Sequence, residues 1–189
     1  RMRTATLLPR DMAGGKPWSA AGLAAVWAQE NTRESLYDAM RRKETYATSG
    51  PRMAVRFFGG WNYPRDLLQQ PDWMTLAEQQ GVPMGGKIIA GDTPPRFLVS
   101  AQKDAGTPRS PGTDLQRVQI IKGWLDADGK THEQVYDVAW SDGRKPGADG
   151  KLPPVGNTVN VAEATYSNSI GAPVLTASWT DLNFNAAQK

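Results

Sequence analysis

Four polar side chains in the first third of the chain are of types that could contact an anionic group. Asn31 and Arg33 follow the short apolar run 22–28, and Ser49 and Arg52 follow the run 45–48. Arginine suits an anion because its planar fork can donate to two oxygens at once. If both runs are parallel strands, the four side chains share the rim at the carboxyl ends of the strands, where α/β folds bind ligands. We therefore predict contacts to a small anionic substrate from Asn31, Arg33, Ser49 and Arg52.

The same residues also have a purely structural interpretation. Asn31 and Glu34 have the spacing of a capping box, in which the first side chain caps a helix and the second reaches back. Arg52 can equally pair with a carboxylate on the surface. The residue types alone leave both interpretations open.

Three patterns that look like chemical motifs have simpler explanations. Residues 81–87 fit the G-x-x-x-x-G-K part of a P-loop, but Ile88 stands where a Ser or Thr must bind magnesium. The acidic run that starts at Asp126 lacks EF-hand spacing, because Gly129 is its fourth residue and not its sixth. The only histidine, His132, lies in an alternating run typical of a strand. We interpret the three as a turn-rich connector, a hairpin tip and a strand residue.

The composition limits the chemistry that this chain can perform alone. It has no cysteine and one histidine, which excludes disulfides, thiolate catalysis and a His-rich catalytic zinc site built from its own residues. We therefore predict no catalytic residue, no metal ligand and no cofactor in this chain itself.

Charge and hydropathy limit its partners. The net charge is only +3, and the one basic run, 41–43, falls at the end of an expected helix, where cations stabilise the helix dipole. No apolar run is long enough to span a bilayer. We predict neither nucleic acid nor membrane as a partner. Because the first residue is not Met, we expect a C-terminal part of a longer polypeptide whose upstream part is its partner, in the periplasm or outside the cell.

The elements that would position the four polar residues form a strand–helix–strand unit. The run 22–28 predicts a buried strand, the capping signal at residue 31 begins a helix that reaches residue 43, and 45–48 is a second strand. We expect the two strands to be parallel, as in α/β folds.

From residue 52 the pattern is that of an antiparallel β domain. Alternation from residue 53 predicts a strand that Gly59 and Gly60 end, and 64–80 predicts a helix that Pro71 splits. The clearest signal is a hairpin formed by 115–125 and 131–140, because Asp128-Gly129 is a strong turn dipeptide. A turn-rich stretch at 81–95 and further strands at 97–101, 159–161 and 173–180 suggest a sandwich.

Several motifs resemble one known family. Residues 22–34 and Tyr46-Ala47-Thr48-Ser49-Gly50-Pro51-Arg52 are similar to the end of the catalytic region in a large bacterial family of unknown function, related to the PHP (polymerase and histidinol phosphatase) metallohydrolases. Residues 82–86, 122–124 and 136–140 also resemble it, although Lys87 stands where that family commonly has an acidic residue.

The resemblance implies a distorted α/β barrel that holds a cluster of divalent metal ions on upstream ligands, followed by a β-rich region. The expected fold is then α+β. Residues 1–51 are the strand–helix–strand remnant of the barrel, and residues 52–189 form an antiparallel β-sandwich-like domain with one inserted helical segment. The expected function is that of a C-terminal fragment of a metal-dependent, phosphoesterase-like hydrolase, without a complete active site in this chain.

Two alternatives from other classes remain at this point. One is a non-catalytic β-sandwich module that binds carbohydrate through exposed Trp61, Trp124 or Trp140. The other is a purely structural accessory domain. Solvent exposure of the tryptophan rings separates these two.

Overall fold

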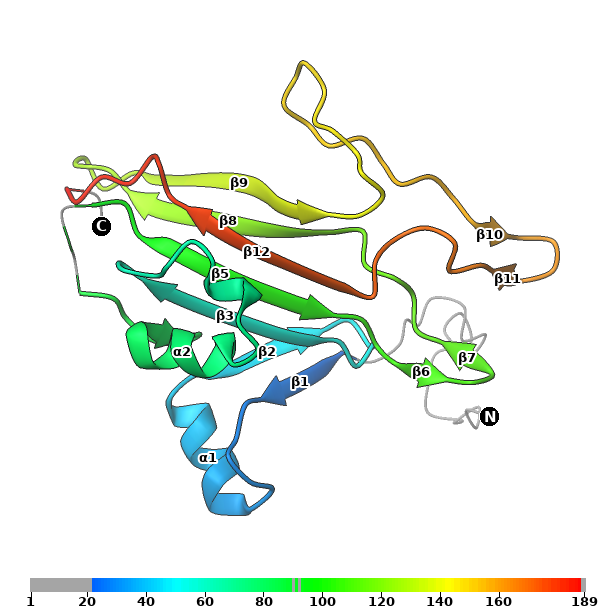
Figure 1. Cartoon of the computed structure of the whole chain (residues 1–189), viewed down its shortest axis with the longest axis horizontal. Helices are drawn as coiled ribbons and strands as arrows, with labels where there is room; N and C mark the ends of the chain where they lie inside the picture. Colours follow the sequence, from blue (N-terminus) through cyan, green and yellow to red (C-terminus); the bar gives the residue numbers. More distant parts are fainter. Residues whose placement is uncertain (1–21, 90, 92, 188–189) are drawn as a thin grey trace, which may run out of the picture.

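The computed structural model describes residues 22–89, 91 and 93–187, and the irregular segment expected at 1–17 lies outside this range. Two α-helices and one 3₁₀-helix accompany the strands of the described part (Figure 1). Every strand pairing in it is antiparallel. The described part of the chain is therefore mostly β with few helices, and it forms several antiparallel sheets without a closed barrel.

The first unit consists of β1 (Leu23–Val26), α1 (Arg33–Arg41) and β2 (Thr45–Thr48). The expectation of parallel strands is wrong, because Val26 pairs with Thr45 and Leu23 with Thr48. The ladder continues past Val26, where the Trp27 N–H donates to the Glu44 carbonyl at 2.9 Å. Lys43, with φ 61°, turns the chain from the helix straight into β2. Helix α1 thus lies in the connection of an antiparallel hairpin. The strand β2 begins at the same end of the ribbon at which β1 ends.

Helix α1 begins one residue later than the capping box predicted. Thr32 is the N-cap, and its hydroxyl accepts a hydrogen bond from the Ser35 N–H at 3.3 Å. Asn31 therefore lies outside the helix.

A four-stranded sheet forms the centre of the molecule. Its strand order is β12-β5-β3-β4, from β3 (Ala54–Gly60), β4 (Val82–Pro83), β5 (Arg96–Gln102) and β12 (Val174–Thr180). Gly59 and Gly60 are the last two residues of β3 and pair with Phe97 and Arg96, so they do not break the strand before its end.

One face of this sheet is covered by helices. The predicted helical segment is split around Pro71 into the 3₁₀-helix η1 (Leu67–Gln69) and α2 (Trp73–Gln80). They cover a compact core in which Phe58 and Leu98 are fully buried. Phe58 and Leu98 are cross-strand partners, so strand alternation places them on the same face.

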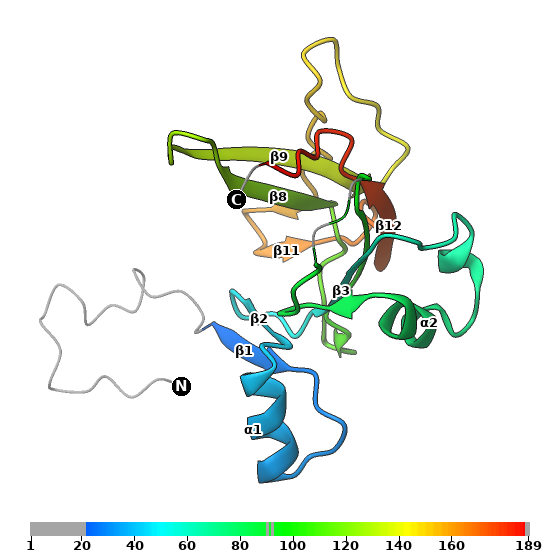
Figure 2. The same cartoon turned by 90° about the vertical axis from the view of Figure 1, so that its left-hand side faces the viewer.

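The other face carries a row of aromatic rings and the predicted hairpin. The hairpin is confirmed as β8 (Arg117–Leu125) and β9 (Thr131–Trp140), with its turn at 126–130 and an irregularity between Val118 and Gln119. It lies against β12 at the edge of the four-stranded sheet, and its tip projects from the molecule (Figure 2). The result is a two-layer, sandwich-like arrangement in which four strands face only two.

Short strand pairs and loops complete the fold. They are β6 (Gly106–Thr107) with β7 (Ser110–Pro111), and β10 (Val159–Asn160) with β11 (Thr165–Tyr166). The loop after β9 is held by Arg144, whose guanidinium donates to the carbonyls of Gln116, Ser141 and Pro153. In the described part of the chain, no helix has the length and apolar character needed to cross a membrane.

Three contacts are prominent among those that attach the β1–α1–β2 unit to the central sheet. The Trp27 indole N–H donates to the Val55 carbonyl at 2.8 Å, and the Tyr46 hydroxyl donates to the Met53 carbonyl at 2.9 Å. The third contact is a steric one at Gly85, which has φ +82° and lies directly against the backbone after α1. A Cβ built there would lie 2.6 Å from the Arg42 carbonyl oxygen. The connector that resembles a P-loop therefore forms a closely packed corner at Gly85, where the backbone after α1 lies against it.

Candidate functional site

The four predicted contact residues do not share one rim. In the antiparallel ribbon, Asn31 and Arg33 follow the end of β1, whereas Ser49 and Arg52 follow the opposite end of the ribbon, at the end of β2. All four side chains are exposed. The shared site inferred from parallel strands is therefore wrong in its geometry.

The surroundings of Arg52 also disfavour an anion. The backbone N–H of Arg52 donates to the Asp104 carboxylate at 2.6 Å, and the Gly106 N–H donates to the same side chain at 2.8 Å. The hydrogen bond from Arg52, followed by the one from Gly106, lowers the pKa of Asp104 below its ordinary value. A bound anion would meet this ionised carboxylate, and the two negative charges would repel each other.

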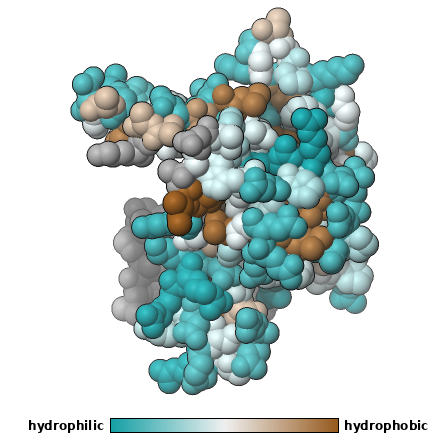
Figure 3. Space-filling model, turned by 60° about the vertical axis from the view of Figure 1, so that its left-hand side comes forward, coloured by the Kyte–Doolittle hydropathy of each residue, from teal (hydrophilic) through white to brown (hydrophobic). Residues whose placement is uncertain are grey.

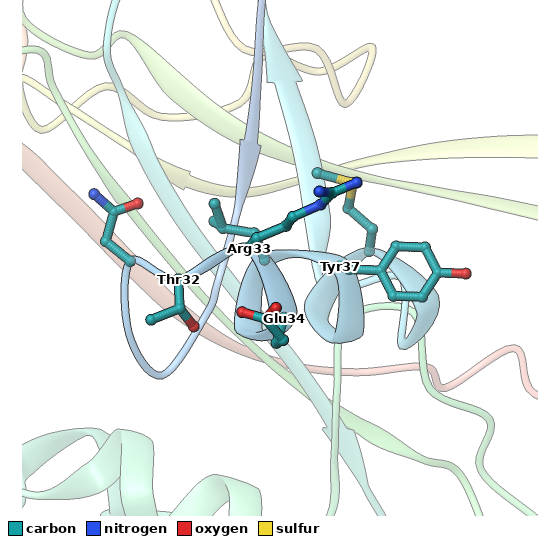
Figure 4. A pocket seen from close by; sticks show the side chains of 7 residues that line it. Thr32, Arg33, Glu34 and Tyr37 are labelled. Carbon is teal, nitrogen blue, oxygen red and sulfur yellow. The ribbon is translucent and has the colours of Figure 1, made fainter.

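The outer face of α1 presents a broad hollow of about 700 Å³. Its described lining runs from Asn31 to Met40 and therefore comes from one helix and the turn that precedes it. In Figure 4, Arg33, Glu34 and Tyr37 project outward from this helix. Tyr37 is 60% exposed and Met40 is 54% exposed. The described wall of this hollow includes the apolar side chains of Leu36, Tyr37 and Met40.

A second cavity, which we call the aromatic cleft, lies between the central sheet and the hairpin and measures about 420 Å³. Phe57, Phe97 and Trp179 form its floor, on adjacent strands of the sheet. Their rings are stacked in a row, with centroids 5.6 Å apart for Phe57–Phe97 and 5.8 Å apart for Phe97–Trp179. Tyr136 of the hairpin continues the row, 4.7 Å from Trp179.

The walls of the aromatic cleft are largely apolar. Trp61, Ile88, Ile120 and Phe184 contribute to them, and Trp61 and Phe184 meet edge to face at 5.6 Å. Gly59 leaves room for Ile88, because a Cβ at Gly59 would lie 2.7 Å from the Ile88 side chain. In the space-filling view of Figure 3, hydrophobic surface gathers in the recess beneath the lobe that projects at the upper left.

A single ion pair lines the aromatic cleft among the described residues. Lys122 of β8 lies 2.6 Å from the carboxylate of Asp181, which directly follows β12 and whose side chain is only 5% exposed. The Lys122 ammonium also donates to the Asn183 carbonyl at 3.0 Å and lies 5.3 Å from the centre of the Trp124 ring. The pair places a hydrogen-bond donor and an acceptor side by side against an apolar wall.

Comparison with known proteins identifies the family of the chain. The model of a family described as a protein of unknown function, DUF3604, matches residues 2–189. The chain belongs to the DUF3604 family. No curated protein and no solved structure matches the chain. The match confirms the expectation of a family of unknown function, and it covers nearly the whole chain.

The described residues of the DUF3604 chain do not assemble a metal centre. No group of three or more His, Asp or Glu side chains lies close enough together to hold an ion within 22–89, 91 and 93–187. His132 is engaged in the hairpin, with its Nε2 2.6 Å from the Asp126 carboxylate and its ring stacked 5.3 Å from that of Trp124. The interpretation of Asp126 as part of a hairpin tip is confirmed.

The aromatic cleft was not predicted from the sequence. Phe57, Phe97 and Trp179 are separated by 40 and 82 positions, and only the strand register brings them together. Lys122 and Asp181 are 59 positions apart and meet because the hairpin folds over β12. One signal for the cleft was available in the sequence. Each of three β-type runs contains an aromatic residue, and each of those rings must be covered by apolar neighbours.

Proposed function

We propose that this chain is the accessory C-terminal part of a larger metal-dependent, phosphoesterase-like hydrolase, and that α1 packs against the catalytic part of the same polypeptide. In this proposal residues 1–51 belong with the catalytic part and residues 52–189 form a β-rich accessory domain. The exposed apolar stripe on α1 is the observation that carries the proposal.

Within the described residues, the stripe lies on the exposed side of α1. Ala39 is fully buried on the inner side, whereas Tyr37 and Met40 are mostly exposed and Leu36 is half-buried. A helix of nine residues and a two-stranded sheet are each marginal in water on their own. Covering the stripe would remove apolar surface from water and stabilise both elements.

The hydrolase part of the proposal is supported by the resemblance of the first two motifs to PHP-related enzymes. Within residues 22–89, 91 and 93–187, no group of three or more His, Asp or Glu side chains lies close enough together to hold an ion of the implied cluster. The metal ligands would then lie in the catalytic part, and this chain would contribute packing and shape.

The tryptophan rings favour this role over a flat carbohydrate-binding platform. Trp124 stacks on His132, and the Trp140 indole N–H donates to the Arg144 carbonyl at 2.7 Å. Trp61 lines the aromatic cleft instead of joining the other two rings on one surface. All three rings are half-buried.

The packing of α1 can be tested with one substitution measured in two polypeptides. Met40→Arg should leave the melting temperature of this chain nearly unchanged, because the side chain is exposed, and should lower that of the proposed longer polypeptide. Asp38→Arg, on an exposed position of the same helix, is the matched control. Equal stability of the wild-type and Met40→Arg forms of the longer polypeptide would overturn the packing proposal.

The hydrolase class requires a separate assay. Phosphatase and phosphodiesterase activities with added manganese, magnesium or zinc should appear in the longer polypeptide and be absent from this chain. Robust turnover by this purified chain, retained after repeated purification, would contradict the accessory role.

A further inference from the structure

We propose that the aromatic cleft binds a small neutral aryl molecule that carries a hydroxyl group. The ring would lie against the row formed by Phe57, Phe97 and Trp179, and the hydroxyl would meet the pair of Lys122 and Asp181. This inference is independent of the hydrolase proposal, since it concerns a cavity on the opposite face of the sheet from the helices.

The cleft exists because the two layers of the sandwich are unequal. Four strands face only the two strands of the hairpin, which lies against β12. Across from Phe57 and Phe97, no third strand continues the hairpin layer within the described residues. The remaining space of about 420 Å³ is within the range of about 300–1,000 Å³ that is typical of small-molecule sites.

The lining favours an aryl ring. Rings already stack along the floor at centroid distances of 5.6 and 5.8 Å, and Trp61 and Phe184 add an edge-to-face pair at the wall. Aromatic rings prefer offset-stacked or edge-to-face neighbours, and the aromatic cleft offers both arrangements to the ring of a ligand. The side chains of Ile88 and Ile120 complete an environment from which water is readily displaced.

The ion pair favours one neutral hydroxyl. Lys122 can donate to a hydroxyl oxygen, and Asp181 can accept the hydroxyl proton. An anionic ligand would compete with Asp181 for Lys122, and a cationic ligand would compete with Lys122 for Asp181. A fully apolar ligand would strip water from the pair and offer no hydrogen bond in return.

The same reasoning disfavours a sugar. A pyranose carries several hydroxyl groups around its ring, and the charged side chains in the described lining are those of Lys122 and Asp181. Most of the remaining hydroxyls would face Phe57, Phe97 or Ile120 without partners, which is costly.

Three probes test the ligand class on the intact chain by NMR. 2-Naphthol should bind, with nuclear Overhauser contacts from its ring protons to Trp179 and Phe97. 2-Methoxynaphthalene keeps the ring but cannot donate a hydrogen bond, so it should bind roughly tenfold more weakly. Methyl glucoside should give no contacts. Equal affinity for the two naphthalenes would overturn the role of the hydroxyl, and contacts from methyl glucoside alone would replace the aryl class with carbohydrate.

A variant tests the polar pair. Lys122→Met keeps an apolar stem of similar length and should weaken 2-naphthol binding roughly tenfold, because the hydroxyl oxygen loses its donor. Lys145→Met, on an exposed loop position, is the matched control. If the loss of Lys122 unfolds the chain, the ring contacts in the wild-type protein still decide the proposal, because their absence for both naphthalenes would refute it.

Discussion

Tyr63 shows how one buried polar group holds two elements together. Its side chain is 5% exposed, and its hydroxyl lies 2.8 Å from the Ala77 carbonyl of α2 and 3.1 Å from the Gly59 carbonyl of β3. Tyr63→Phe should reduce the free energy of unfolding by about 1–2 kcal/mol, because it leaves buried carbonyls without a partner. Urea denaturation measures the change. Tyr37→Phe, at an exposed position, should stay within about 0.5 kcal/mol of the wild type and serves as the control.

The same hydroxyl predicts a dependence of stability on alkaline pH. Burial raises the pKa of Tyr63 from 10.0 to about 12, because the phenolate would lose its hydration. A raised folded-state pKa gives a contribution that is complete below pH 10 and is lost as the pH rises toward 12. The free energy of unfolding of the wild type should fall more steeply across this window than that of Tyr63→Phe. Parallel curves for the two proteins would show that the hydroxyl is not the group responsible.

At the scale of residues, the sequence predicted local features such as the helix cap. It did not predict which residues far apart in the sequence come into contact. The capping signal located the start of α1 to within one residue, but it selected Asn31 where the structure uses Thr32. The roles of Lys122 and Asp181 had no local signal, because they depend on a contact between segments 59 positions apart. The expected shared rim was wrong for a different reason, because it assumed parallel strands and the structure pairs β1 with β2 in antiparallel direction.

Among the elements, the corner at Gly85 makes the sharpest prediction. The residue combines φ +82° with no space for a Cβ against the backbone after α1. Gly85→Ala should therefore destabilise the protein by about 1–3 kcal/mol, from strain and displacement of the corner. Gly150, with φ +72° and nothing within 4 Å of its Cβ position, is the matched control. Thermal unfolding should show the smaller loss for Gly150→Ala, and equal losses would mean that the packing at Gly85 does not matter.

Element types followed from the sequence more reliably than their pairing. Alternation and the Asp-Gly turn predicted the hairpin of β8 and β9 with nearly correct bounds, and Pro71 divided the helical segment as expected. The direction of β2 relative to β1 was wrong, because both directions suit the same two apolar runs. In the structure, the turn at Lys43 leads directly into an antiparallel ladder that begins with the hydrogen bond from Trp27 to Glu44.

For the whole molecule, the structure predicts unequal stability of its parts. The β1–α1–β2 unit has a two-stranded sheet and an exposed helix, whereas β3, β5 and β12 are joined by long ladders around a buried core. Backbone amides of α1 should therefore exchange with deuterium much faster than those of β5. Mass spectrometry of peptides after timed exchange measures the difference. Equal protection of α1 and β5 would show that the two parts unfold as one unit.

The overall β-rich class was predicted, and the unequal layers were not. Counting β-type runs suggested a sandwich, but strand count carries no information on how strands divide between layers. That division depends on β12 pairing with β5 and on the hairpin remaining a separate two-stranded sheet. The aromatic cleft follows from it.

The corner at Gly85 also bears on how variation in this family is to be read. Any side chain there must displace the backbone that joins α1 to β2. Natural selection would then retain glycine at this position for assembly alone, even in relatives that act on different molecules. In a deep mutational scan the position would rank with catalytic residues, although it touches no substrate. A glycine-rich motif that resembles a phosphate-binding loop would thus be retained because it packs two parts of the fold together, and not because it binds phosphate.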